Sequence, residues 1–184
     1  MKIDDFELRK LTVAMAQKNL SISQVIELIK NSNVEGEKLV VSDIKYVVDY
    51  TKTVEQAIYG YYDYIDSDVT AKNFPTPSEM LGKTEERSAR LFYFNREMSA
   101  DDVIIRMKKE GYRPAILIEL LFLGISFPGL QTQFPIYALG SIWRKPIGSA
   151  CIPGLRLANY KRVVCLDYLY SVCKVHFRFL GIKE

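Results

Sequence analysis

The chain has 184 residues, of which 48% are hydrophobic and 12% aromatic. This length and composition fit one domain, or one domain with a helical appendage, and allow a sizeable core. No apolar run reaches the length of about 18 residues that indicates a membrane-spanning helix, and the first residues lack the apolar segment of a signal peptide. The three cysteines have no scaffold spacing and indicate reduced thiols. We therefore expect a cytoplasmic protein that contacts no membrane.

The net charge of +3 is unevenly distributed along the chain. Residues 140–184 contain eight lysines and arginines and two acids, a net charge of +6, and the other residues together carry −3. Such a split is typical of a surface for an anionic partner. It is also typical of a solvated sheet edge, where lysines discourage aggregation.

Residues 1–66 are predicted to be helical. Ser21 and Gln24 form a capping-box pair at the start of one amphipathic helix. A further helix is predicted to begin at Ser42, and its apolar stripe resumes at Val54 and continues to Ile65, with Thr51 to Thr53 as a candidate break. We expect this region to serve as an interaction or oligomerisation element.

Residues 67–88 are predicted to be a linker, because two prolines extend Phe74-Pro75-Thr76-Pro77 and polar residues follow. The remaining residues, 89–184, alternate between helix and strand patterns. Helices are expected from Ser99 to Gly111 and from Pro114 to about Phe122, and strands at 89–94, 136–143, 150–152, 162–168 and 172–180. The predicted fold class is α+β, with the N-terminal helical region followed by a compact domain of helices packed on a mainly antiparallel sheet.

Basic side chains gather on the last predicted strand. The alternation of a strand puts Lys174, His176 and Arg178 on one face, about 7 Å apart. Lys161 and Arg162 are candidates to lie beside this row on a neighbouring strand. A phosphate backbone is a suitable partner for such a row, and tyrosines nearby are suited to base stacking. Nucleic-acid binding through this basic face is therefore an alternative function.

The same alternation argues against a metal or thiol site. Cys173 and His176 point to opposite faces of the predicted strand. They therefore cannot share a zinc ion or form a nucleophile and base pair. We expect Cys173 to lie in the core, and we expect no metal and no cofactor.

A run of four tyrosines lies at the end of the helical region. Tyr61 and Tyr62 belong to the apolar stripe and are expected in the core, whereas Tyr59 and Tyr64 fall outside it. Exposed tyrosines are favoured at protein interfaces because they add contact area at low entropic cost. We predict that Tyr59 and Tyr64 contact a partner protein or a second copy of the chain.

No catalytic motif is present: the sequence has no P-loop, dinucleotide-binding fingerprint, nucleophile elbow or zinc-protease motif. Glu119 lies in an apolar helix pattern, and we expect it to point to solvent and form a salt bridge with Arg113. The predicted function is therefore non-catalytic binding, with protein partners ahead of nucleic acid. The alternative of an enzyme, a nuclease or hydrolase with an unfamiliar site, requires Glu119, Asp167 and His176 to gather in a cleft.

Four short motifs follow one another over residues 112–180: Tyr112-Arg113-Pro114, Gly140-Ser141-Ile142-Trp143, Arg156-Leu157-Ala158 and Phe177-Arg178-Phe179. In this order they resemble motifs of the formylglycine-generating-enzyme and sulfatase-modifying-factor family. The resemblance implies a shortened C-type-lectin-like scaffold. It does not extend to the family's oxidase activity, because the family's catalytic cysteines have no counterpart here in a matching motif. Fold alone does not assign a function to such a scaffold.

Overall fold

The computed structural model describes residues 43–94, 96–171 and 176–184, which belong to one unit spanning Val40–Glu184. The helices expected before residue 43 therefore lie outside the described residues. Within this unit, apolar side chains from strands and helices form two buried clusters on the two faces of one sheet.

The sheet contains nine strands in the described part of the chain. Along its main path the order is β1 (Ile44–Asp49), β3 (Thr84–Tyr93), β9 (Arg178–Lys183), β5 (Ile136–Tyr137), β7 (Ala150–Ala158), β8 (Lys161–Tyr168) and β2 (Tyr64–Ile65). Two further strands attach to it: β4 (Tyr112–Pro114) pairs with β9, and β6 (Trp143–Arg144) pairs with β7. Only the β2–β8 and β5–β9 pairs are parallel, so the α+β class with a mainly antiparallel sheet is confirmed for this unit.

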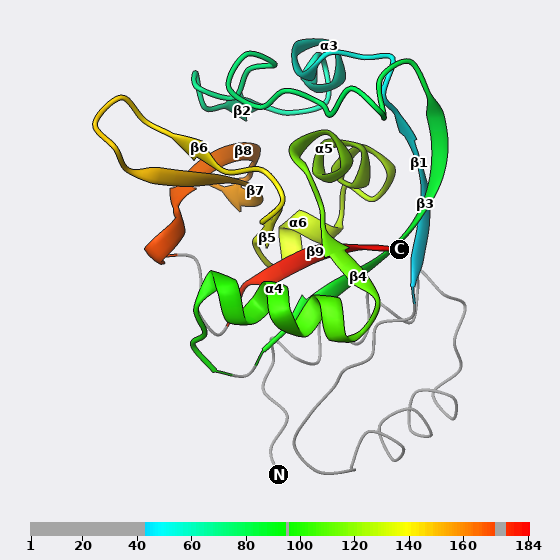
Figure 1. Cartoon of the computed structure of the whole chain (residues 1–184). Coiled ribbons are helices and arrows are strands. Elements are labelled where there is room, and N and C mark those ends of the chain that lie inside the picture. The colour runs from blue at the N-terminus through cyan, green and yellow to red at the C-terminus, as the bar shows by residue number, and fades with distance from the viewer. Residues whose placement is uncertain (1–42, 95, 172–175) are drawn as a thin grey trace, which may run out of the picture. The chain divides into compact units, whose positions relative to one another are not determined.

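Two ten-residue helices cover opposite faces of the sheet. Helix α5 (Leu117–Ser126) packs with Leu91 and Leu180, whereas α4 (Ala100–Lys109) packs with Phe92 and Phe179. Since neighbouring residues of a strand point to opposite faces, the two helices lie on different sides. Figure 1 shows the sheet curving around α5 between β1 and β3 on one side and β7 and β8 on the other. The short helices α3 (Val54–Ile58) and α6 (Leu130–Gln133) and a 3-10 turn (Leu169–Ser171) complete the described elements.

The predicted ends of α4 are confirmed. The Ser99 hydroxyl accepts a hydrogen bond from the Asp102 backbone N–H at 3.1 Å, as an N-cap does. Gly111 follows the helix with φ of +80°, a left-handed conformation that glycine adopts without strain.

The helix predicted from Ser42 to Ile65 is confirmed only at Val54–Ile58, which form α3. Its start is wrong because Ile44–Asp49 form strand β1, and its end is wrong because Tyr64–Ile65 form β2. Tyr46 and Val48 are buried in β1, whereas Val47 is half-exposed, which is the two-residue period of a strand. The apolar positions fit a helical stripe and an alternating strand equally well over so short a segment, and pairing with β3 decides between them.

The helix predicted to begin at Pro114 is also wrong at its start. Tyr112–Pro114 form β4 on the edge of β9, and α5 begins three residues later at Leu117. A residue that precedes proline favours an extended backbone, so Arg113 suits a strand better than a helix start.

Two predicted strands differ from the observed ones. The strand expected over 136–143 is divided into β5 and β6, with a loop between them. The strand expected over 172–180 begins only at Arg178, and residues 172–175 lie outside the described part.

The predicted division into a helical region, a linker and a domain does not match the pairing of the strands. β1 pairs with β3 along its length and β2 pairs with β8, so residues 43–66 belong to the same sheet as residues 89–184. β3 already begins at Thr84, inside the expected linker. Pairing between strands far apart in sequence cannot be recognised from local composition, so composition alone does not place this boundary correctly.

Candidate functional site

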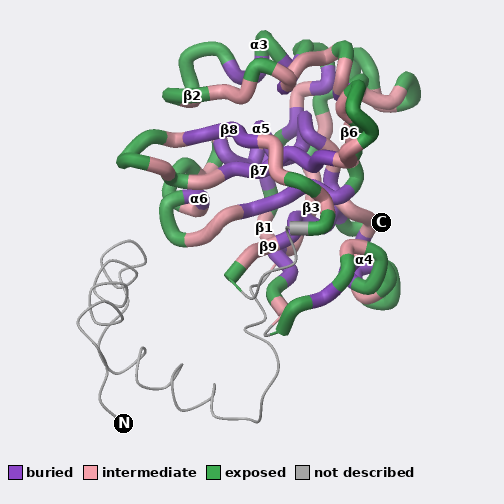
Figure 2. Tube along the Cα trace, turned by 90° about the vertical axis from the view of Figure 1, so that its left-hand side faces the viewer, coloured by how far each residue is buried: buried purple, intermediate pink, exposed green. Residues whose placement is uncertain are grey.

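Four exposed tyrosines lie at the β2 end of the sheet. Their exposed fractions are 85% for Tyr59, 50% for Tyr61, 58% for Tyr64 and 98% for Tyr160. Tyr64 is in β2 opposite Val163 of β8, and Tyr160 is in the turn that leads into β8. In Figure 2 the chain around β2 is largely coloured as exposed. We call these four residues the tyrosine edge.

Residues 59–66 contain three of these tyrosines, and we call them the tyrosine segment. Backbone hydrogen bonds hold this segment on β8. The Asp63 N–H donates to the Arg162 carbonyl at 2.9 Å, and the Asp66 N–H donates to the Val164 carbonyl at 3.0 Å. In return, the Arg162 N–H donates to the Asp63 carboxylate at 2.6 Å. Tyr59, Tyr61 and Tyr64 therefore project from a segment whose backbone is paired with β8, and Tyr160 precedes β8 itself.

The Arg162 side chain points inward and joins three parts of the fold. Its Nη1 donates to the Tyr61 carbonyl at 2.7 Å, and its Nη2 donates to the Gly124 carbonyl of α5 at 2.6 Å. The guanidinium also contacts the Gln131 side chain and lies 4.8 Å from the centre of the Tyr62 ring. These contacts differ from the predicted role of Arg162 in binding an anionic partner, because its donors are engaged within the protein.

Tyr62 forms the second attachment of the segment. Its hydroxyl donates to the Leu121 carbonyl of α5 at 2.7 Å, and burial raises the pKa of this hydroxyl. Gly124 permits the approach, because a Cβ at that position would collide with the Tyr62 hydroxyl. The prediction that Tyr62 packs on the core is confirmed, whereas the same prediction for Tyr61 is wrong.

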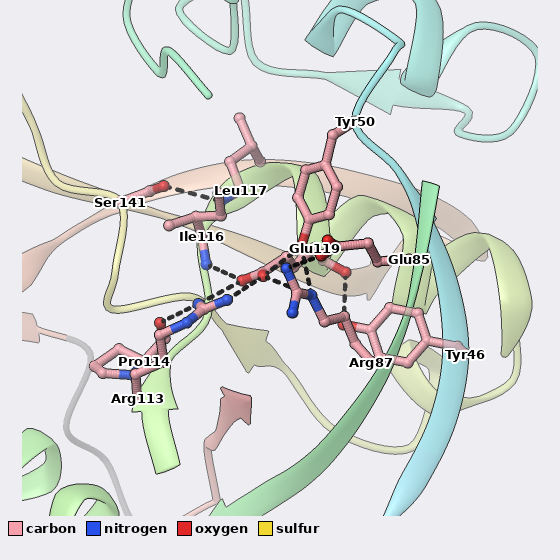
Figure 3. Close-up of polar contacts among 10 residues, drawn as sticks. All are labelled: Tyr46, Tyr50, Glu85, Arg87, Arg113, Pro114, Ile116, Leu117, Glu119 and Ser141. Carbon is pink, nitrogen blue, oxygen red and sulfur yellow. Dashed lines mark hydrogen bonds and ion pairs between the residues drawn. The ribbon is translucent and has the colours of Figure 1, made fainter. Parts of the chain in front are cut away.

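Carbonyl groups of helix α5 accept the hydrogen bonds of Tyr62 and Arg162. The helix is itself fixed by a buried carboxylate near its start. Glu119 is 0% exposed and accepts a pair of hydrogen bonds from Arg113, at 2.6 and 3.0 Å. The Tyr50 hydroxyl and the Ile116 N–H donate to the same carboxylate at 2.7 and 2.9 Å. Figure 3 shows these groups converging on Glu119 from the residue that follows β1, from β4 and from the start of α5.

A second arginine extends this cluster. Arg87 of β3 donates to the Tyr50 hydroxyl at 2.9 Å, lies 3.9 Å from the Glu119 carboxylate and forms an ion pair with Glu85. Burial, followed by the charge of Glu119, raises the pKa of Tyr50. All the charges of the cluster are therefore paired inside the protein.

The salt bridge predicted between Glu119 and Arg113 is confirmed, but the expected solvent-facing position of Glu119 is wrong. Because four donors already satisfy the carboxylate, the cluster fixes α5 to the sheet. Asp167 belongs to a different set of contacts, since it accepts a 2.6 Å hydrogen bond from Tyr137. Glu119 and Asp167, two of the three groups that the enzyme alternative requires in one cleft, thus have different hydrogen-bond partners in the described residues.

The predicted basic row does not form as a single strand face. His176 is exposed in the turn before β9, and Arg178 begins β9. Lys161 is exposed at the start of β8, while Lys174 lies outside the described residues. A row on one strand face requires residues 174–178 to belong to one strand, but β9 begins only at Arg178.

The two cysteines in the described part are buried and unpaired with each other. Burial raises the pKa of the Cys165 thiol to about 12 and also raises that of Cys151. Such thiols stay protonated at neutral pH and are poor nucleophiles. Within residues 43–94, 96–171 and 176–184 no three His, Cys, Asp or Glu side chains are placed to hold a metal ion. The expected core position of Cys173 lies outside these residues.

Two further exposed tyrosines lie apart in sequence from the tyrosine edge. Tyr168 and Tyr170 stack with ring centres 5.4 Å apart, and the Lys145 amino group lies 5.8 Å from the Tyr168 ring centre. Tyr170 is 82% exposed. Tyr170 is therefore an exposed tyrosine outside the tyrosine edge whose replacement can serve as a control.

Comparison of the chain with protein-family models, with curated proteins and with solved structures found no match. None of the helices in the described part of the chain has the length and apolar character needed to span a lipid bilayer.

Proposed function

We propose that the chain is a non-catalytic binding protein that contacts a partner protein through the tyrosine edge. The observation that carries this proposal is the combination of four exposed tyrosines with a paired backbone beneath them. Tyrosines supply large contact areas with few rotatable bonds, so little entropy is lost when they are buried by a partner. Attachment of the segment to β8 and α5 lowers that cost further, because the segment does not have to be ordered on binding.

The sheet ends at the tyrosine edge, which adds a second reason. β2 pairs with β8 on one side and is the last strand of the sheet path in the described residues. The end of a sheet presents backbone groups that a partner strand can pair with. A second copy of the chain is one form that the partner protein can take.

Nucleic-acid binding stays the second candidate. The stacked Tyr168 and Tyr170 rings, with Lys145 beside them, are the observation that favours it. Bases stack on such rings, and lysine attracts the phosphate backbone. This candidate uses different tyrosines from the first, so the two can be separated by mutation.

Affinity recovery from native lysate tests the proposal. The tagged protein is compared with the double variant Tyr59→Ser/Tyr64→Ser and with Tyr170→Ser as a control of similar exposure. Central interface tyrosines contribute about 2 kcal/mol each, so loss of one such residue weakens binding roughly 30-fold. We expect the wild type and Tyr170→Ser to recover the same protein after nuclease treatment, and the double variant to lose it.

The alternative outcomes are distinct. Equal recovery by the double variant would contradict the proposal. Recovery that disappears with nuclease and with Tyr170→Ser would instead support nucleic-acid binding. Concentration-dependent dimerisation that the double variant loses identifies the partner as a second copy.

A further inference from the structure

Arg178, at the start of β9, is flanked by two aromatic rings. Its guanidinium carbon lies 3.8 Å from the centre of the Tyr93 ring and 4.7 Å from the centre of the Phe134 ring. Tyr93 is directly opposite Arg178 on β3, and Phe134 precedes β5, the neighbour of β9 on the other side. Cation–π contacts from both sides restrict the guanidinium and remove water from it.

Unlike Arg87 and Arg90, the two arginines of β3 that contact aromatic rings, Arg178 has no carboxylate within 4 Å among the described residues. Arg87 and Arg90 both contact rings and also pair with acids. The hydrogen bonds of the Arg178 side chain run from Nη1 to the carbonyls of His176 and Phe177, at 3.3 and 3.2 Å. Its Nε and Nη2 donate no hydrogen bond to any residue in the described part of the chain.

A half-buried guanidinium without a negative partner is costly, and its burial lowers the pKa of Arg178. An anion that accepts hydrogen bonds from it would remove this cost. The Nε and Nη2 groups of arginine donate in parallel, and their spacing matches two oxygens of one carboxylate or phosphate group. Because Nη1 donates to the His176 and Phe177 carbonyls, Nε and Nη2 are the Arg178 donors that remain for such a group.

We propose that Arg178 is a binding site for an oxyanion, a carboxylate or phosphate group held by Nε and Nη2. The site does not depend on the tyrosine edge. Arg178 is on β9, in the interior of the strand order, whereas the tyrosine edge is at the β2 end. Binding there is therefore open to measurement with small anions alone.

Titration of the arginine Nε–H signals by NMR tests this site in the wild-type protein. Inorganic phosphate and acetate are added at constant ionic strength, with chloride as the reference anion. We expect the Arg178 signal to shift and saturate with phosphate, with acetate or with both, and the anion that saturates identifies the chemical source. A shift that grows linearly and equally with all three anions reflects charge screening alone and would overturn the proposal.

Arg178→Lys separates the geometry of the site from its charge. Lysine keeps the positive charge but lacks the planar pair of donors, so the affinity for the saturating anion should fall roughly tenfold or more. Because this variant has no Nε–H at position 178, its titration and that of the wild type are compared through the backbone amide signals of β9. Arg144→Lys, at an exposed arginine of β6, should keep the wild-type affinity. Unchanged affinity in Arg178→Lys would also overturn the proposal, and if that variant does not fold, the wild-type titration decides.

Discussion

Replacement of Glu119 with glutamine should lower the free energy of unfolding by about 3–5 kcal/mol, the range for breaking a buried ion pair. Glu119 is fully buried, and its carboxylate is the partner of Arg113 and of the Tyr50 hydroxyl. A glutamine has one acceptor oxygen in place of two, and its amide N–H groups face the arginine donors. Arg113 and Arg87 are then left partly buried without their negative charge. Urea unfolding followed by circular dichroism measures the loss.

Glu86→Gln is the matched control for Glu119→Gln. Glu86 pairs with Lys45 at 3.4 Å, but both side chains are more than half exposed. Surface ion pairs of this kind contribute about 0–1 kcal/mol, so the control should change stability little. Similar losses in the two variants would mean that burial of Glu119 does not decide its effect.

Replacement of Arg162 with glutamine should cost roughly 1.5–3 kcal/mol, as expected for loss of hydrogen bonds from a charged donor. The change removes the donors to the Tyr61 and Gly124 carbonyls and the contact with the Tyr62 ring. Urea unfolding again measures the effect. The tyrosine segment should lose more order than the core, since Arg162 joins it to α5.

Lys161→Gln provides the comparison for Arg162, because it removes a positive charge from the adjacent position of β8. Lys161 is exposed, and surface substitutions away from special contacts usually change stability by less than about 0.5 kcal/mol. If Arg162→Gln costs no more than Lys161→Gln, the inward contacts of Arg162 do not hold the segment.

Local patterns predicted those elements whose signals lie within a few residues. The Ser99 cap and the Gly111 stop of α4 were recognised in this way. The ion pair of Glu119 with Arg113 was also predicted, because the partners are six residues apart. Tyr50 contacts the same carboxylate from 69 residues away, and no local pattern indicates that contact.

In the candidate site, too, local patterns predict the exposure of side chains but not their contacts with residues far away in sequence. Tyr59 and Tyr64 are exposed as expected from their positions outside the apolar stripe. Arg162 was assigned to a basic surface because alternation along β8 does not reveal what covers a given face. Its partners Tyr61 and Gly124 come from distant segments, 101 and 38 residues away in sequence. The dense tyrosine run was the signal in the sequence, and pairing of β2 with β8 determines how it is presented.

The claim that the tyrosine segment is held on β8 can be tested directly by amide hydrogen exchange in the wild-type protein. The informative amides are those of Asp63 and Asp66, which donate to the carbonyls of Arg162 and Val164. We predict that both are protected in the wild type, and that Arg162→Gln speeds their exchange while amides that pair β7 with β8 stay protected. Exchange of the Asp63 and Asp66 amides at the rate of an unstructured peptide in the wild type would contradict the account.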